Sequence, residues 1–538
     1  RVEFQVEEKL HLADINHFNL NFTGIKNPLE FDMDGSVGDE PLLMSGKLDS
    51  PLAIIDNKTL RLKLELDALK INLETEGSIT NPINLESAEL DLSLELPEPT
   101  ESILKISNIV SAVKPNKNIP DVPVNIRGLL KVTPTDIRFE QMKLNAGKSD
   151  LSGNVYTDLS GEKPYIEAKL ESKLIDLNEL VPATIRKDDE ERLEQDIDKD
   201  KDKDKDKKDN KRKLFSTEPL PVLDGLHALD ARLQYKLYKL TSNKQEIDNI
   251  DLNLVLKDGH LIIDPLSIDF SQGTIITQLG LESDKKLNFE LDTEIIKLRY
   301  DRLMAILGTR EYAKGELDAE IKLTAKGESI SELMSKLYGS VRVTTVDGVL
   351  DNNALKFLSK DLVSMIPFTD TSDRQKINCG VVQFDINSGI VETHSMVVNT
   401  GAVSALGTGT IDLTSETLSL YVAPRSKRTS VLKIALVPVN ITGPLSSPSV
   451  TPDVAGSTIS TTKTATNISL TVVTGGVWLL AEGLTNNLWD KFVDDTDYCA
   501  RALAGDRIEP ARIKLESEDD EDEDEDDESE FLGDEEDF

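Results

Sequence analysis

Histidine and cysteine, the residues from which most metal sites and many catalytic sites are built, are scarce in this sequence. Only five histidines and two cysteines occur among the 538 residues. The histidines show no HxxxH or HxH spacing, the cysteines form no CxxC pair, and no GxSxG nucleophile motif is present. The sequence therefore predicts no catalytic, metal-binding or cofactor-binding site.

Aromatic residues are also scarce, and the 61 Lys and Arg residues are outnumbered by 98 Asp and Glu residues. Aromatic residues make up 5% of the chain, so any core or groove is expected to be lined mainly by Leu, Ile and Val. The formal net charge is -37. This charge argues against nucleic acid as a partner, because binding nucleic acid depends on neutralising phosphates with Lys and Arg.

Two segments concentrate charge and hold few apolar residues. Residues 186–213 alternate acidic and basic side chains, and residues 516–538 carry 17 acidic residues with neither Lys nor Arg. Neither segment can bury enough apolar surface to offset the entropy of ordering, so both are predicted to be disordered. We expect the first to be an insertion between two strands and the second to be a solubilising tail.

Cys379 and Cys499 lie far apart in the sequence. One disulfide is possible in an oxidising compartment, but two cysteines alone leave the pairing open. The sequence begins with Arg1, and no charged-then-apolar signal segment follows it. We therefore interpret the chain as a fragment or processed form from which a targeting or anchoring segment is missing.

Alternation of apolar and polar residues predicts strands along most of the chain. Apolar side chains fall on one side of each strand and charged or polar ones on the other, the pattern of a strand with one solvated face. The apolar positions are Leu60, Leu62, Leu64, Leu66, Leu90, Leu92, Leu94, Ile250, Leu252, Leu254 and Leu256. An Asp258-Gly259 turn then leads to Leu261 and Ile263, which predicts a hairpin.

A second hairpin is predicted in the stretch GAVSALGTGTIDLTSETLSLYVAP, residues 401–424. Its apolar positions are Ile411, Leu413, Leu418, Leu420 and Val422. Helical candidates are few and short, at residues 102–113, 300–307, 329–338 and 354–365. The fold is therefore predicted to be mainly β, with more apolar strand surface than these helices can cover.

The most apolar run is ISLTVVTGGVWLLAEGL, residues 468–484. Its length is at the lower limit for a membrane span, and Ser469, Gly475, Gly476 and Glu482 weaken that interpretation. Trp478 and Trp489 lie 11 residues apart, about three helical turns, so both fall on one face of a helix. Three interpretations stay open: a span, an interfacial helix with Trp478, Leu479, Leu480 and Trp489 at the membrane surface, and a helix that plugs the end of the sheet.

Five stretches resemble, in order, the periplasmic region of the AsmA family of bacterial envelope proteins. The most specific is AGKSDLSGNVYTDLSGEKPYIEAKLESKLIDLNEL (146–180), which is similar to the family's G-x-S-D-x-S-G strand pair and the Pro-led strand after it. The others are residues 214–273, 314–352, 377–453 and a C-terminal segment ending in DYCARALAG, similar to the family's PC-x-x-AL end. Two features depart from the family: its N-terminal transmembrane helix is not in this sequence, and the acidic tail has no family counterpart.

The resemblance implies an elongated groove, formed by a twisted antiparallel sheet that curls but stays open. It also implies a non-enzymatic protein that conducts phospholipid between the inner and outer membranes, at the periplasmic face of the inner membrane of a Gram-negative cell. Acyl chains would then cover the apolar strand faces, and the strand positions named above would be lipid-facing. The implied partners are phospholipids, the inner membrane through the missing anchor, and an envelope or outer-membrane protein. A scaffold that assists outer-membrane protein assembly is the alternative.

This organisation divides the chain into five expected regions. Residues 1–185 and 214–455 form the two parts of the groove, and residues 186–213 separate them. Residues 456–515 hold a linker and the apolar helix, and residues 516–538 form the tail. We expect the helix to lie at the groove's end or on a bilayer surface without spanning it, because the acidic tail is repelled by anionic lipid.

Overall fold

A computed structural model describes residues 2–6, 9–37, 40–109, 120–180, 213–221, 225–242, 245–284, 286–306, 313–351, 374–401, 403–427, 434–435, 438–453, 470–473, 476–480 and 496–510. The chain divides into two compact units. The first comprises Arg1–Val349, Val382–Val391 and Asp412–Glu416, and the second comprises Leu350–Val381, Glu392–Ile411 and Thr417–Phe538. Except for Lys213, the charged segment 186–213 lies outside the described residues, as does the acidic tail.

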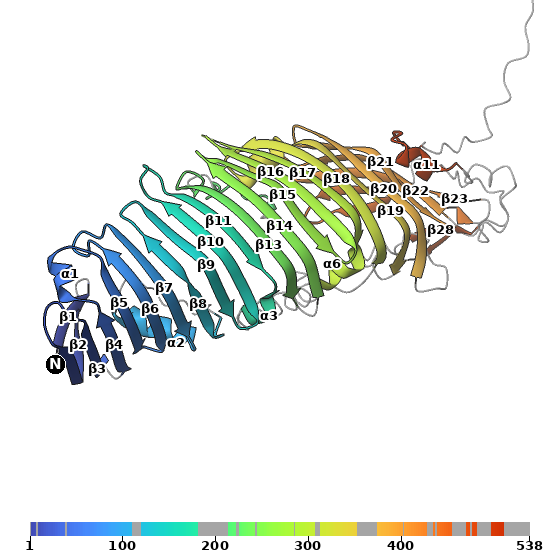
Figure 1. Cartoon of the computed structure of the whole chain (residues 1–538). Helices are drawn as coiled ribbons and strands as arrows, with labels where there is room; N and C mark the ends of the chain where they lie inside the picture. The colour runs from blue at the N-terminus through green and yellow to red at the C-terminus, as the bar shows by residue number, and fades with distance from the viewer. Residues whose placement is uncertain are drawn as a thin grey trace, which may run out of the picture. The chain divides into compact units, whose positions relative to one another are not determined.

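The fold is mainly β, a long open antiparallel sheet with few short helices, which confirms the expected fold class (Figure 1). The strands of the first unit are β1 (Val2–Val6), β2 (Lys9–Phe22), β3 (Leu29–Val37), β4 (Glu40–Leu48), β5 (Leu60–Ala68), β6 (Ile71–Thr80), β7 (Ser87–Leu96), β8 (Val124–Val132), β9 (Asp136–Ala146), β10 (Ser149–Asp158), β11 (Tyr165–Ser172), β12 (Ile175–Asp176), β13 (Asp230–Ser242), β14 (Gln245–Lys257), β15 (His260–Phe270), β16 (Gly273–Ser283), β17 (Leu287–Arg299), β18 (Ala313–Gly327) and most of β19 (Tyr338–Asp351). Its helices are α1 (Pro51–Ile55), α2 (Pro99–Ile109), α3 (Leu177–Leu180), α6 (Tyr300–Ile306) and α7 (Ile330–Ser335).

Tight turns join most neighbouring strands of the first unit into antiparallel pairs. The predicted Asp258-Gly259 hairpin is present: Lys257 pairs with His260, and both turn residues have positive φ. That backbone gives the two-residue turn the twist that matches its strands. The same geometry recurs between β5 and β6 at Leu69 and Lys70, where no glycine or asparagine signals it.

One junction departs from the antiparallel pattern. β11 pairs with β13 in parallel, from Tyr165 opposite Asp230 to Ser172 opposite Leu237. A parallel pair needs a long connection that returns the chain to the starting edge of the sheet. The predicted insertion falls in this connection, between α3 and β13. The charged segment therefore occurs at the point where the hairpin repeat is broken.

The short helices of the first unit lie at the ends of strands, and α2, α3 and α6 follow the same edge of the sheet in Figure 1. Ser102 of α2 is fully buried, and its hydroxyl donates to the backbone oxygen of Lys70 (2.9 Å) in the β5–β6 turn. Glu179 of α3 accepts from the backbone N–H of Lys148 (2.8 Å) in the β9–β10 turn. Three of the four expected helices are present in part as α2, α6 and α7, and the candidate at 354–365 lies outside the described residues.

The second unit holds all or part of β20 (Arg374–Asn387), β21 (Ile390–Thr400), β22 (Val403–Asp412), β23 (Thr417–Ser426), β25 (Val439–Pro444) and β26 (Ser449–Pro452), together with α11 (Tyr498–Leu503). Its core brings side chains of β20, β21 and β22 against α11 and the residues that follow it. Val381, Val397, Leu406, Ala502 and Ile508 are all at most 2% exposed there.

The helix expected in the apolar run that begins at residue 468 is wrong where the structure describes this segment. β27 (Leu470–Val473) and β28 (Gly476–Leu480) pair antiparallel, and β28 also pairs with β24 (Ile434–Ala435) in a small separate sheet. β-branched residues and glycine disfavour a helix, and the β-branched ones favour a strand. Trp489 lies outside the described residues. Within the part of the chain that the structure describes, no helix combines the length and the apolar character that crossing a membrane requires.

Candidate functional site

The apolar positions predicted from the sequence lie together on one face of the first unit. Leu64 of β5 pairs with Thr75 of β6, and Thr75 pairs with Leu92 of β7. Further along, Leu252 of β14 belongs to the same face, because each residue directly opposite another points to the same side of a sheet. The sequence predicted the alternation within each strand, and the register now aligns the strands with one another.

Three rows of residues run across the strands from β4 to β18, and we call them together the apolar face. Neighbours in a row are paired except Gly128 with Met142, at a register shift, and Leu151 with Ser172, just beyond the first pair of the β10–β11 ladder. The first row is Leu48, Leu62, Gly77, Leu90, Leu130, Phe139, Val155, Ala168, Leu233, Leu254, Ile263, Leu279, Leu291 and Leu323. The central row is Gly46, Leu64, Thr75, Leu92, Gly128, Met142, Gly153, Leu170, Tyr235, Leu252, Leu266, Thr277, Thr293 and Ile321. The third row is Met44, Leu66, Leu73, Leu94, Ile126, Leu144, Leu151, Ser172, Leu237, Ile250, Ile268, Ile275, Ile295 and Ala319.

The rows contain ten of the thirteen positions that the sequence predicted for the first unit, and the other three extend the same face. Leu60 pairs with Ile79 beside the first row, and Leu256 pairs with Leu261 on the same side. The rows continue through the parallel junction, where Leu170 pairs with Tyr235. The face is therefore continuous across the one change in strand direction.

No side chain in the three rows is charged, and most are half-buried and not fully covered. Fourteen strands at ~4.8 Å spacing give a length of about 60 Å, and the outer rows lie ~14 Å apart. The footprint of the three rows is then roughly 850 Å². Beyond the rows, Phe18 and Leu20 of β2 continue the same side of the sheet through β3, and they are 54% and 47% exposed. The face therefore keeps apolar surface that the described helices do not bury.

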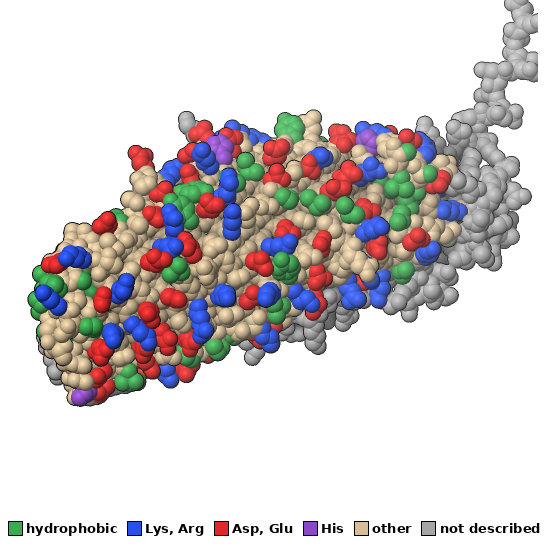
Figure 2. All heavy atoms as spheres, viewed as in Figure 1, with side chains coloured by type: hydrophobic (Ala, Val, Ile, Leu, Met, Phe, Trp, Pro, Cys, Tyr) green, Lys and Arg blue, Asp and Glu red, His purple; other side chains and the backbone are tan. Residues whose placement is uncertain are grey.

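The opposite face of these strands carries charges of both signs, as Figure 2 shows over the strands of the first unit. Lys63 and Glu65 form an ion pair on β5 (2.7 Å), and Arg127 and Glu95 form one across strands (2.9 Å). The hydrogen bond from Lys63 lowers the pKa of Glu65, and the same bond raises the pKa of Lys63. The two faces thus differ sharply in polarity, as a sheet with one solvated face requires.

A charged cluster around Glu332 of α7 holds this helix at the ends of the strands. The Glu332 carboxylate accepts from the ammonium groups of Lys286 (2.6 Å) and Lys336 (2.7 Å) and from the backbone N–H of Glu328 (2.9 Å). The two lysine bonds and then the backbone bond hold the pKa of Glu332 at about 2. This cluster joins α7 to the β16–β17 turn. It therefore attaches the helix at the ends of the strands and adds no charge to the apolar face.

In the second unit, the predicted hairpin places Leu418, Leu420 and Val422 on one face of β23. They pair with Gly443, Ile441 and Val439 of β25. Leu418, Leu420, Val422 and Ile411 are half-buried. Leu413 lies in the turn after β22 and not in a strand, and its backbone N–H donates to Gly389.

On the other side of β23, Ser419 is exposed, but the two alternate residues that follow it are buried. Tyr421 is 8% exposed and Ala423 is fully buried. Leu406 of β22 is buried in the cluster that also contains Ala502 of α11 and Ile508. Sequence reasoning missed the covered side of β22 because α11, which belongs to the same cluster as Leu406, is far away along the chain.

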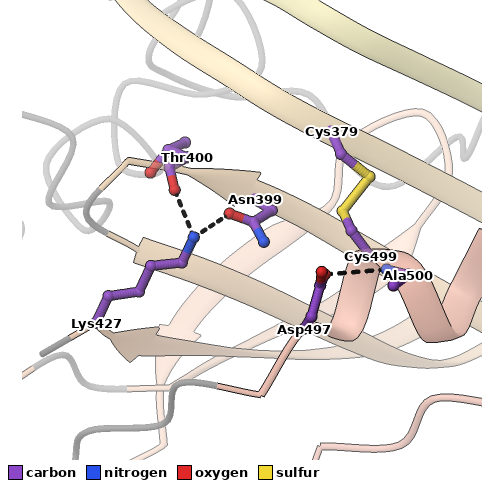
Figure 3. The surroundings of a disulfide bond; sticks show 7 residues. All are labelled: Cys379, Asn399, Thr400, Lys427, Asp497, Cys499 and Ala500. Atoms are coloured by element: carbon purple, nitrogen blue, oxygen red, sulfur yellow. Dashed lines mark hydrogen bonds between the residues drawn. A yellow bond between two sulfur atoms is a disulfide. The ribbon is translucent and has the colours of Figure 1, made fainter. Parts of the chain in front are cut away.

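A disulfide between Cys379 of β20 and Cys499 of α11 ties this cover to the strands (Figure 3). The side chain of Asp497 accepts from the backbone N–H of Ala500 (3.0 Å) and begins the helix. Lys427, which directly follows β23, donates to the backbone oxygen of Thr400 at the end of β21 (2.8 Å). The pairing that the sequence left open is therefore present. A structural disulfide is typical of an oxidising compartment.

No group of three or more His, Cys, Asp or Glu side chains among the described residues is arranged to hold a metal ion. A model of the AsmA family matches residues 43–396. The chain belongs to the AsmA family. It is also similar to the AsmA family protein YhjG of Escherichia coli (strain K12), with 22% identity over 417 residues.

That alignment covers 74% of this chain but 58% of YhjG, so the chain spans little more than half the length of this relative. The AsmA match includes β5 to β18, and with them nearly all of the apolar face. AsmA family membership indicates a role associated with the cell envelope of a Gram-negative bacterium. The feature that an envelope function must explain in this AsmA chain is the long uncharged face.

Proposed function

We propose that this AsmA protein binds phospholipid acyl chains along the apolar face and conducts lipid between the inner and outer membranes. The observation that carries the proposal is the continuity of three uncharged rows over 14 strands. Burying a methylene contributes about 0.8 kcal/mol, so one acyl chain of a dozen methylenes gains roughly 10 kcal/mol on leaving water.

The uniformity of the rows suits movement as well as binding. Leu, Ile, Val and Phe follow one another along the first row, so an acyl chain displaced by one strand meets a similar surface. The binding energy then changes little along the path. A carboxylate or ammonium in the rows would create a barrier, because a charge next to hydrocarbon loses its hydration. The disulfide is consistent with a site of action in the oxidising periplasm.

Charge inserted into the face tests the proposal. In one variant Leu252 and Leu254 of β14 are both changed to Asp, and in the matched control Asn253→Asp adds a carboxylate to the same strand on the opposite face. Phospholipid that copurifies with each full-length chain is measured by native mass spectrometry, and circular dichroism checks that the sheet is retained.

We expect wild type and Asn253→Asp to retain lipid and the double Asp variant to lose most of it. A folded double variant with undiminished lipid would contradict the proposal, as would a lipid-free wild type. If polar-face changes impair function while the double Asp variant does not, a scaffold for outer-membrane protein assembly becomes the better account.

A further inference from the structure

Hydroxyl-bearing side chains are unevenly distributed over the apolar face. The first row contains none, and the third row contains Ser172 alone. The central row contains four: Thr75, Tyr235, Thr277 and Thr293. The polar atoms of the face therefore gather on the midline, where they are flanked on both sides by aliphatic side chains.

Three of these four hydroxyls have partners on the face itself. Thr277 and Thr293 are directly opposite each other on β16 and β17, and their hydroxyl oxygens are 3.1 Å apart. The Tyr235 hydroxyl donates to the Ser172 hydroxyl (3.0 Å) across the parallel junction. These hydroxyls are each hydrogen-bonded within the protein, so none of them needs a ligand as a partner.

Thr75 differs from the other three. It is 8% exposed, and its hydroxyl has no hydrogen-bond partner among the described residues. The residues directly opposite it are Leu64 and Leu92, whose side chains offer neither a donor nor an acceptor. A buried hydroxyl without a partner costs free energy, and folded proteins leave few of them. Valine has nearly the same shape and suits a strand equally well, so packing alone does not require threonine here.

Thr75 also lies far from both ends of its strand. It is the fifth residue of the ten in β6, which places it roughly 14–17 Å from either end of the strand. Neither turn of β6 brings a polar group near it. The described residues supply no acceptor for this hydroxyl, and its oxygen is covered in this structure. A molecule on the midline of the face would supply the acceptor once the surrounding side chains shift.

We propose that Thr75 is a polar contact for the lipid bound on the apolar face: its hydroxyl donates to a carbonyl oxygen at the head of an acyl chain. The proposal rests on the proposed function and specifies the ligand further. It requires an acyl lipid, with its carbonyl over Thr75 and its chain against Leu64 and Leu92. A phospholipid ester and the carboxyl group of a free fatty acid both supply that oxygen.

The test compares wild type with Thr75→Val, which removes the hydroxyl and keeps the branched shape. Delipidated full-length chain is offered limiting, equal amounts of ester-linked and ether-linked phosphatidylethanolamine with the same chain length. Native mass spectrometry measures the ratio of the two in the complex with one lipid bound. Ser93→Ala, which removes a hydroxyl from the polar face of the neighbouring strand β7, is the matched control. A second arm measures binding of palmitic acid.

We expect wild type and Ser93→Ala to favour the ester lipid over the ether lipid, and Thr75→Val to lose about 2- to 10-fold of that preference, the range of one hydrogen bond. If only palmitic acid binding depends on Thr75, the carbonyl comes from a free fatty acid. Lipid binding by wild type with no dependence on Thr75 in either arm overturns this inference and leaves the proposed function standing. Failure of wild type to bind any of these lipids overturns both. Delipidated Thr75→Val should unfold at the same or a higher temperature than wild type, which separates a lost contact from a lost fold.

Discussion

Removing the disulfide should release α11 from the strands of the second unit. The perturbation is the double change Cys379→Ala and Cys499→Ala. The two cysteines are 120 residues apart in the sequence, and a cross-link over such a loop stabilises the folded state by about 5 kcal/mol in the chain-entropy account. α11 has six residues, which is too short to be stable alone. Its attachment therefore depends on the disulfide and on the packing of Ala502 and Ile508.

Hydrogen exchange is the suitable assay, because it reports local opening of α11 separately from the rest of the chain. The protected amides include Ala504, which donates to Ala500 (3.0 Å), and Ile508, which donates to His394 (3.2 Å). A loss of about 5 kcal/mol corresponds to roughly three to four powers of ten in the opening equilibrium. We expect peptides covering 498–508 to exchange much faster in the double variant, and peptides from β5 and β6 to be unchanged.

Exchange of the 498–508 peptides at the wild-type rate in the double variant would contradict this expectation. The apolar cluster would then hold α11 by itself. Reduction of wild type with dithiothreitol should reproduce the effect of the double variant, since both remove the same covalent link. An effect of the alanine changes without an effect of reduction would instead point to the lost packing of two sulfur atoms.

Two further predictions concern the first unit. The pKa of Glu332 is lowered to about 2 by Lys286 and its other donors, so the carboxylate's stabilising effect is present above pH ~4.5 and is lost as the pH falls towards 2. The stability difference between wild type and Glu332→Gln, measured by urea unfolding, should therefore shrink over that interval. A difference that grows on acidification would contradict the assignment. Gly153→Ala should cost at least about 1–3 kcal/mol, because φ is +146° and the new Cβ would lie 2.0 Å from the Lys169 backbone oxygen; Gly280→Ala, whose nearest neighbour atom is 3.7 Å away, is the control and should leave the melting temperature nearly unchanged.

The sequence by itself determined which residues share a strand face. Leu60, Leu62, Leu64 and Leu66 alternate with charged residues, and a strand has a strict period of two, so the local pattern was sufficient. The Asp258-Gly259 hairpin was predictable for the same reason, since its turn is set by the backbone preferences of two adjacent residues. Mainly β architecture and the apolar face of each strand followed from these local rules.

Local sequence patterns did not predict which distant strands pair, or the structure of the segments near the C-terminal end of the chain. The parallel pairing of β11 with β13 joins residues more than sixty positions apart, and the sequence between them carries no sign of direction. The segment at 470–480 has an apolar composition that fits a helix or a strand, and its pairing partners decided in favour of strands.

The isolation of the Thr75 hydroxyl and the burial of Tyr421 were likewise decided only in the folded chain. Whether a polar atom finds a partner depends on what lies opposite it, and for Thr75 these are Leu64 and Leu92 on two other strands. Whether a strand face is wet depends on what packs over it, and for β22 that is a helix tied on by Cys499. Both are contacts between residues distant in sequence, which composition and periodicity do not encode.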